Sequence, residues 1–242
     1  MKVIFNADDF GLTQGVNDGI VQSHLEGVVN STTMLVGMPA EKHAIALAKE
    51  LPSLNVGLHL RFTLGAPLTP AAKLTNSQGN FFSYTEFWAH KGYSSQAIYE
   101  ECIAQVEAFL DTGLSLSHLD SHHHVHTHPD FLPVITEVAA QYQVPLRGQL
   151  VPGIKYIFTD KFYDQGVGLD LLVRHLVELS QTYDIAEVMC HPACVDKALL
   201  QGSGYAEQRE KELAVLTEDK LAVLLKRHSI EITDYSALSI QG

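Results

Sequence analysis

Histidine and aspartate are concentrated in one short segment of this chain, between Asp120 and Pro129. The segment reads Asp-Ser-His-His-His-Val-His-Thr-His-Pro, and five of the seven residues from His122 to His128 are histidine. The uses of histidine are narrow: metal ligation, proton transfer and pH switching. Such a concentration predicts that the segment holds a cation with affinity for neutral imidazole, either a transition metal or an Mg²⁺-like ion.

Not every histidine of this segment can reach one ion. If the segment is extended, alternate side chains share a face, so His122 and His126 lie on one side and His123 on the other. His122, which is nearest the preceding apolar run, is our first choice as ligand, and His126 is the second. His128 is held extended by Pro129, which suits the first turn of a helix, so it is expected to lead into that helix. The alternative is an incidental metal-binding patch.

Two adjacent carboxylates, Asp8 and Asp9, follow the apolar run 2–7. Adjacent residues of an extended segment point to opposite sides. One carboxylate can therefore bind a metal while its neighbour stays free as a base. The alternative is a turn that caps the following helix.

Two further histidines, His59 and His191, each end an apolar run. His59 suits a metal ligand, because it stands level with the aspartates at the end of another predicted strand. His191 precedes Pro192 and suits a proton donor that is not a ligand. Cys190 and Cys194 flank it with a spacing that is unusual for zinc, so both thiols are expected to be buried or inert. For each histidine the alternative is a structural role in the core.

Together these residues form a set for metal-assisted hydrolysis. A metal polarises a carbonyl and lowers the pKa of bound water. A free carboxylate takes the proton of the water, and a positioned histidine protonates the leaving group. An amide needs this last step most, because an amine anion is a very poor leaving group.

The elements that must position these residues alternate along the whole chain. Strands are predicted at about 2–7, 31–37, 55–60, 115–120, 144–149, 185–190 and 230–234. Helices are predicted at about 14–26, 40–51, 95–112, 129–142, 168–182 and 205–228. The last helix is expected to break near Thr217, which would cap a second helix. This alternation implies parallel strands joined by crossover helices.

Polar residues stand at the carboxyl ends of many different predicted strands: Asp8 and Asp9, His59, Asp120–His122, Arg147 and His191. A (β/α) barrel builds its site in this way. A doubly wound open sheet would concentrate the site at one switch point. We therefore predict an α/β fold with an irregular, seven-stranded (β/α) barrel and a single domain over residues 1–242.

Two connections, at about 61–95 and 150–167, are too long to be simple turns. Both are rich in aromatic residues: Phe62, Phe81, Phe82, Tyr84, Phe87, Trp88 and Tyr93 in the first, and Tyr156, Phe158, Phe162 and Tyr163 in the second. This composition argues against disorder. Rings at the mouth of a site would suit the apolar faces of sugars. Equally, they could pack on each other or on a second subunit.

Composition excludes several kinds of partner. The formal charge of −12 comes from 28 acidic and 16 basic residues, with no basic cluster beyond pairs, which argues against nucleic acid. No apolar run approaches the length that crosses a bilayer, and no cleaved signal is expected. Three cysteines make no disulfide framework, so a cytoplasmic location is expected.

Five motifs, in order along the chain, resemble those of the YdjC-like carbohydrate deacetylases, the chitooligosaccharide deacetylase group. They are Asn6-Ala-Asp-Asp-Phe-Gly11, Ser31-Thr-Thr33, Gly57-Leu-His59 with Thr63-x-Gly65-x-Pro67, His118-Leu-Asp-Ser-His-His-His-Val-His126, and Met189-Cys-His-Pro-Ala193. The resemblance implies a (β/α) barrel-like fold, a homodimer, Mg²⁺ or another divalent ion, and removal of acetyl groups from N-acetylated sugars such as chitin oligosaccharides. It also implies roles for single residues: Asp9, His59 and His122 as metal ligands, Asp8 as base, His191 as acid and Arg147 as orienting the base.

The chain departs from the related polysaccharide deacetylases, which share the Asp-Asp start but use a His-[Ser/Thr]-x-x-His-Pro ligand motif. Here the residue after His122 is His123. The sequence thus leaves open whether His126 is also a ligand. The metal is open too, because an aspartate with two imidazoles suits zinc by ligand softness, whereas the resemblance implies magnesium.

Two other classes of function compete with a deacetylase. One is a barrel phosphoesterase or amidohydrolase. Those enzymes often open with His-x-His on the first strand, whereas no histidine precedes His24 here. The other is a non-catalytic metal- or sugar-binding module, which would need neither a spare acid nor a spare histidine.

Overall fold

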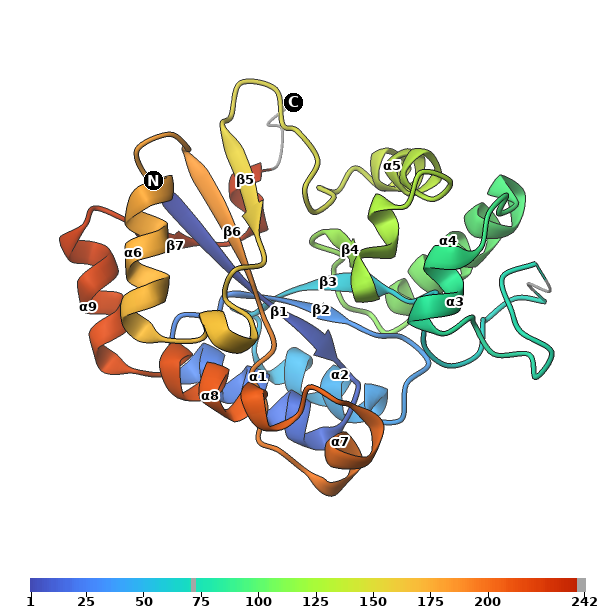
Figure 1. Cartoon of the computed structure of the whole chain (residues 1–242), viewed down its shortest axis with the longest axis horizontal. Coiled ribbons are helices and arrows are strands. Elements are labelled where there is room, and N and C mark those ends of the chain that lie inside the picture. The colour runs from blue at the N-terminus through green and yellow to red at the C-terminus, as the bar shows by residue number, and fades with distance from the viewer. Residues whose placement is uncertain (71–72, 239–242) are drawn as a thin grey trace.

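Seven parallel strands form one curled sheet in the computed structural model, which describes residues 1–70 and 73–238 (Figure 1). The strands are β1 (Lys2–Phe10), β2 (Ser31–Met34), β3 (Asn55–Leu60), β4 (Leu119–Ser121), β5 (Tyr156–Thr159), β6 (Ile185–Cys190) and β7 (Glu231–Thr233). Their order is β4-β3-β2-β1-β6-β5, and β7 pairs with the first half of β1. The sheet is an open half-barrel within a single α/β domain.

The helices lie around the sheet (Figure 1). They are α1 (Gln14–Leu25), α2 (Glu41–Glu50), α3 (Tyr84–Ala89), α4 (Ser95–Leu110), α5 (Leu132–Gln141), α6 (Leu169–Leu179), α7 (Lys197–Gly202), α8 (Glu207–Leu216) and α9 (Asp219–Arg227). Short 3₁₀ turns are η1 (His122–Thr127), η2 (Asp164–Gly166) and η3 (Tyr235–Leu238). Within the described ranges no helix is both long and apolar enough to cross a membrane.

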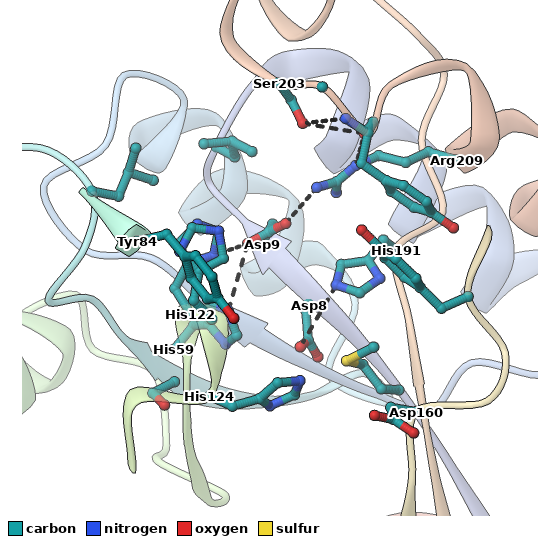
Figure 2. A pocket seen from close by; sticks show the side chains of 18 of the residues that line it. Asp8, Asp9, His59, Tyr84, His122, His124, Asp160, His191, Ser203 and Arg209 are labelled. Carbon is teal, nitrogen blue, oxygen red and sulfur yellow. Dashed lines mark hydrogen bonds and ion pairs between the residues drawn. The ribbon is translucent and has the colours of Figure 1, made fainter. Parts of the chain in front are cut away.

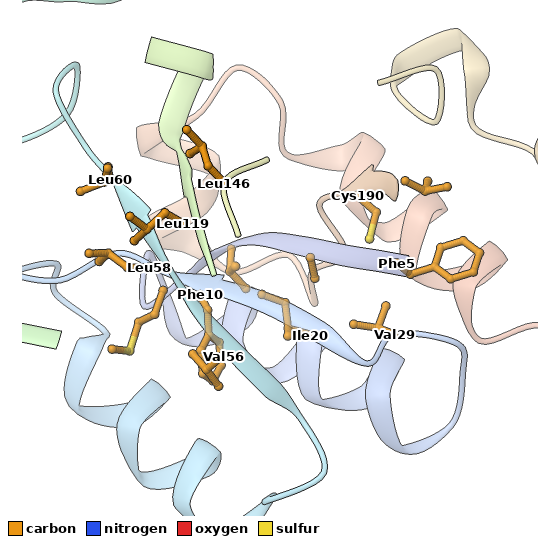
Figure 3. Packing of buried hydrophobic residues seen from close by; sticks show 14 of the residues in the cluster. Phe5, Phe10, Ile20, Val29, Val56, Leu58, Leu60, Leu119, Leu146 and Cys190 are labelled. Atoms are coloured by element: carbon orange, nitrogen blue, oxygen red, sulfur yellow. The ribbon is translucent and has the colours of Figure 1, made fainter. Parts of the chain in front are cut away.

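The central strands are covered on both faces. Every residue of β1 after Lys2 is buried, as are all residues of β2 and β6. Parallel strands of this kind consist of nearly continuous apolar runs, because helices cover the sheet. Figure 3 shows Phe5 and Phe10 of β1 in this core with Ile20 of α1 and Val56 of β3. The core holds the carboxyl ends of the strands in place beneath the polar residues that follow them.

The fold class is confirmed, but one predicted strand is wrong. Around 144–149 the structure has only an isolated parallel bridge between Leu119 and Leu146, because the chain turns two residues later at Gly148, which has a φ of 73°. The missing strand is β5, which lies inside the predicted loop 150–167 and pairs with β6. The predicted strand at 115–120 is shorter and later than expected, at Leu119–Ser121.

Three helix predictions also need correction. The long connection 61–95 contains helix α3, whose N-terminus has a capping box between Ser83 and Glu86. Helix α5 begins at Leu132 with a proline in its first turn, so the predicted start at Pro129 is wrong. The predicted break between α8 and α9 is present, but Thr217 is the C-cap of α8.

Candidate active site

A cavity of about 570 Å³ opens at the carboxyl ends of the strands (Figure 2). Side chains reach it from distant parts of the chain: Asp8 and Asp9 at the end of β1, His59 in β3, His122 after β4, His191 after β6, and Arg209 in α8. The structure therefore brings together all five predicted ligand and catalytic residues. This convergence of strand ends is the one that the barrel prediction requires.

Asp9, His59 and His122 form a compact group of possible ligand atoms in the cavity. Asp9 Oδ1 lies 2.9 Å from His122 Nδ1 and 3.5 Å from His59 Nε2. One ligand atom from each of the three residues lies within 4.8 Å of the other two, which is close enough to hold one cation. The three side chains predicted as ligands thus lie close enough together to hold one metal ion.

Asp9 points into this group because β1 is irregular at its end. The pairing register of β1 with β2 shifts between Ala7 and Phe10, and Asp9 has a φ of 73°. A positive φ at a non-glycine residue is uncommon and marks local strain of the kind found at functional sites. Arg209 Nη2 donates to the outer oxygen, Asp9 Oδ2, at 2.7 Å. The other oxygen, Asp9 Oδ1, therefore remains available to the group that Asp9 forms with His59 and His122.

His59 is oriented by a buried carboxylate on the neighbouring strand. The register of β3 and β4 places His59 opposite Asp120, and His59 Nδ1 lies 2.6 Å from Asp120 Oδ1. Burial opposes the charged imidazole, but Asp120 and the nearby aspartates raise the pKa of His59 to about 9. A histidine held by a carboxylate on one nitrogen, with the other nitrogen aimed at further oxygens, is the usual arrangement of a metal ligand.

The histidine segment is not extended, so the prediction that its alternate side chains share one face is wrong. Residues 122–127 form η1, and His123 and His124 have left-handed φ values of 57° and 56°. His122 nonetheless reaches Asp9. His126 neither belongs to the converging group nor lines the cavity, and its Nδ1 lies 2.5 Å from Ser121 Oγ. His128 is extended as expected.

Asp8 is paired with a buried arginine rather than with the three-residue group. Arg147 donates from Nη1 and Nη2 to the two oxygens of Asp8, each at 2.7 Å, and its Nε donates to Glu187. Burial alone would raise the pKa of Asp8, but Arg147 outweighs it and holds that pKa well below its ordinary value. Asp8 is therefore a carboxylate at neutral pH, and Arg147 fixes its position.

His191 completes the site on the other side of Asp8. Its Nε2 lies 4.0 Å from Asp8 Oδ2, and its Nδ1 is buried without a hydrogen-bond partner. Burial and the charge of Arg209 lower the pKa of His191 to about 3. Its backbone N–H donates to Glu212, whose own pKa burial raises to about 7. The imidazole is thus neutral at pH 7 and free to accept a proton.

Sequence reasoning missed several residues of this site. Arg209 and Glu212 lie on helix α8, whereas the predicted site residues were found at the ends of predicted strands. It also missed Tyr205, which lines the cavity. Tyr84 and Tyr163 line the cavity too, and both are among the rings that the sequence suggested for the mouth of a site. No comparable signal precedes α8.

The curled parallel sheet and the acid–imidazole site at its carboxyl edge define a (β/α)-barrel-like protein. The family model described as YdjC-like protein matches residues 2–227, so the chain belongs to this family. A carbohydrate deacetylase of Vibrio cholerae is 61% identical to it, covering 98% of this chain and 96% of the relative.

Two solved structures resemble the fold. A protein of Enterococcus faecalis, described as a cellobiose-phosphate cleavage protein, has a TM-score of 0.90 at 29% identity and covers 99% of both chains. A family 4 carbohydrate esterase from Streptomyces lividans, in complex with acetate, has a TM-score of 0.54 at 11% identity. The match covers 96% of this chain and 91% of the esterase, and it shows likeness of fold alone.

Proposed function

We propose that this protein is a metal-dependent deacetylase that removes acetyl groups from N-acetylglucosamine-containing oligosaccharides such as diacetylchitobiose. The observation that carries the proposal is the convergence of Asp9, His59 and His122 beside an unligated pair, Asp8 and His191. The 61% identity to a carbohydrate deacetylase supports the same activity. A site that only bound a metal or a sugar would not need the additional pair.

The donor set fits a divalent cation. Asp9 Oδ1, His59 Nε2 and His122 Nδ1 would hold it, and hydrogen bonds to Arg209 and Asp120 already orient two of these ligands. A divalent cation there would polarise the acetamide carbonyl and lower the pKa of water. Two imidazoles with one carboxylate favour zinc or another late transition metal, whereas the family resemblance favours magnesium.

Asp8 is the proposed base. The carboxylate is ionised at neutral pH, and Arg147 prevents it from turning toward the three ligands. Its strong pairing makes it a weak base, so it can take only a proton from water that is already acidified. As it takes that proton, the water oxygen becomes the nucleophile that attacks the carbonyl carbon.

His191 is the proposed acid. Because the imidazole is neutral at pH 7, it must gain its proton during the reaction. Asp8 is the nearest source, with 4.0 Å between Asp8 Oδ2 and His191 Nε2. The proton taken from water would pass from Asp8 to His191 and then to the leaving nitrogen as the C–N bond breaks. The products are acetate and a free amino sugar.

The test is release of acetate from diacetylchitobiose by the purified protein, with and without a chelator. We expect acetate release that the chelator abolishes and that a single added divalent cation restores. Asp8→Asn should lower kcat by about 10²- to 10⁴-fold, the usual contribution of a general base. Undiminished acetate release by Asp8→Asn, or by protein freed of metal, would contradict the mechanism.

The competing functions give different products when the protein is assayed with other substrates. Phosphate released from a sugar phosphate would favour the phosphoesterase reading, and cleavage of cellobiose phosphate would extend the description of the Enterococcus faecalis structure to this chain. Binding of the sugar without turnover would favour a binding module. The homodimer and the cytoplasmic location remain predictions, and light scattering of the purified protein tests the first.

A further inference from the structure

A row of rings leads from the metal-ligand group to the surface. The His122 and His123 ring centroids lie 3.9 Å apart, and His123 is in edge contact with Tyr84 at 5.1 Å. Tyr84 in turn meets Trp88 edge-on at 6.3 Å. Tyr84 lines the cavity on the side of His122, opposite His191 and Arg209 (Figure 2). The row is therefore continuous with the proposed site.

The two outer rings stand on a rigid support. Tyr84 and Trp88 are four residues apart on α3, so they share one face of this helix. The capping box of Ser83 and Glu86 fixes its N-terminus. Phe87 of the same helix is buried against Phe131, with 5.0 Å between ring centroids, and its ring also meets Trp88 edge-on at 5.4 Å. The exposed rings are thus held in place before any ligand arrives.

Both rings keep a large exposed area although the phenylalanines beneath them are buried. Tyr84 is 54% exposed and Trp88 is 37% exposed, whereas Phe87 and Phe131 are at most 1% exposed. Trp88 also contacts His128, at 5.4 Å, on its inner side. Rigid aromatic faces beside a polar cavity supply apolar contact at little entropic cost. The C–H faces of a pyranose ring have the matching shape and polarity.

We propose that Tyr84 and Trp88 form a subsite that binds the sugar residue next to the one carrying the reacting acetamide. The inference rests on the proposed function, since it presumes that a sugar occupies the cavity. It adds to that function the residues that bind the second sugar, and it predicts that a monosaccharide in the cavity leaves the two rings uncovered.

Trp88 is the only tryptophan of the chain, so its emission reports on this subsite directly. The probe is triacetylchitotriose titrated into Asp8→Asn protein, in which the sugar stays acetylated. We expect a saturable blue shift and protection from acrylamide quenching, because the ring leaves water. N-Acetylglucosamine at equal concentrations should leave the emission unchanged. An emission that does not respond to the trisaccharide would overturn the subsite, as would a shift produced by protein concentration alone.

Kinetics with otherwise unaltered protein separate the subsite from the chemistry. Trp88→Ala and Tyr84→Leu should each raise KM for diacetylchitobiose by about 3- to 10-fold with little change in kcat, as expected for one lost ring contact. Tyr84→Phe should keep the KM, because the ring face and not the hydroxyl makes the contact. Leu171→Ala is the matched control, since Leu171 is an exposed apolar residue of α6.

The two proposals fail in different ways. One outcome is that acetate is released while KM is unchanged in Trp88→Ala and Tyr84→Leu and the emission does not respond to the trisaccharide. In that case the subsite is wrong and the deacetylase proposal stands. If the trisaccharide shifts the emission but no N-acetylated sugar loses acetate, the subsite stands and the deacetylase proposal is wrong.

Discussion

At the scale of single residues, the site is organised by side chains that hold the proposed ligands in position. Asp120 is hydrogen-bonded to one ring nitrogen of His59, and Arg209 donates a hydrogen bond to one carboxylate oxygen of Asp9. The remaining nitrogen and oxygen therefore face each other without rearrangement, which is what a preorganised site requires. The sequence predicted His59 and Asp9 as metal ligands because each stands at the end of an apolar run. It could not predict Arg209, which lies 200 residues from its partner on a helix.

The choice of ligand in the histidine segment can be tested by metal content. His122→Ala should lose the bound divalent ion, because it removes one of three converging donors. His123→Ala should retain it, since His123 Nδ1 lies 2.9 Å from Thr63 Oγ1 and no atom of His123 belongs to the converging group. Mass spectrometry of native protein and titration calorimetry measure both. Equal retention by the two variants would show that His122 is not a ligand.

Glu212 should make stability depend on pH. Burial raises its pKa to about 7 in the folded protein, above an ordinary value of 4.5. The folded state therefore binds the proton more tightly, so its stability falls as pH rises from about 4.5 and levels off above about 7. The shift corresponds to roughly 3 kcal/mol.

Urea unfolding of unaltered protein and Glu212→Gln at pH 5 and pH 8 measures this effect. The free energy of unfolding of Glu212→Gln, relative to the unaltered protein, should rise between the two pH values by an amount of that order. Parallel pH dependence in the two proteins would show that Glu212 keeps its ordinary pKa.

At the scale of elements, the sequence predicted where helices and long strands lie but not how the short connections bend. The helical periods of α1, α2 and α4 and the apolar runs of β3 and β6 are local patterns that the chain displays directly. The left-handed turn at His123 and His124 follows instead from contacts that form on folding, such as that of His123 with Thr63, 60 residues away in the chain. Strand β5 is four residues long and lies within an aromatic connection, so no period marks it.

The loop that carries His191 depends on close contact with α1. Cys194 N donates to Gly15 O at 2.9 Å, and a Cβ at Gly19 would lie 2.3 Å from Ala193 Cα. An alanine in an ordinary helix position stabilises relative to glycine by about 0.5–1 kcal/mol. At Gly19 the overlap with backbone outweighs this gain, so Gly19→Ala should destabilise the protein by about 1–3 kcal/mol.

Thermal unfolding and acetate release measure the two consequences of Gly19→Ala, because a displaced loop also moves His191 away from Asp8. The matched control is Gly168→Ala, where the nearest atom to the added Cβ would be Leu171 Cδ1 at 3.6 Å. If Gly19→Ala is as stable and active as this control, the close contact does not position the loop.

At the scale of the whole molecule, the barrel was predictable from the positions of the polar residues along the chain. Acids and histidines at the ends of β1, β3, β4 and β6 are separated by long stretches of chain, and only a curled parallel sheet brings such ends to one rim. The sequence could not show how far the sheet closes. The pairings within the described residues run from β4 to β5, and beyond β4 they continue only as the Leu119–Leu146 bridge.

A site assembled from such distant segments links metal binding to global stability. Asp9, His59 and His122 can converge only in the folded chain, so a cation bound by them stabilises the folded state alone. At about 100 times its Kd the cation should add about 2.7 kcal/mol, which corresponds to a rise in Tm of roughly 5–10 °C for a chain of this size. Differential scanning calorimetry with zinc, magnesium or a chelator measures the shift. His122→Ala should show none of it, and an equal rise in that variant would mean that the stabilising ion binds elsewhere.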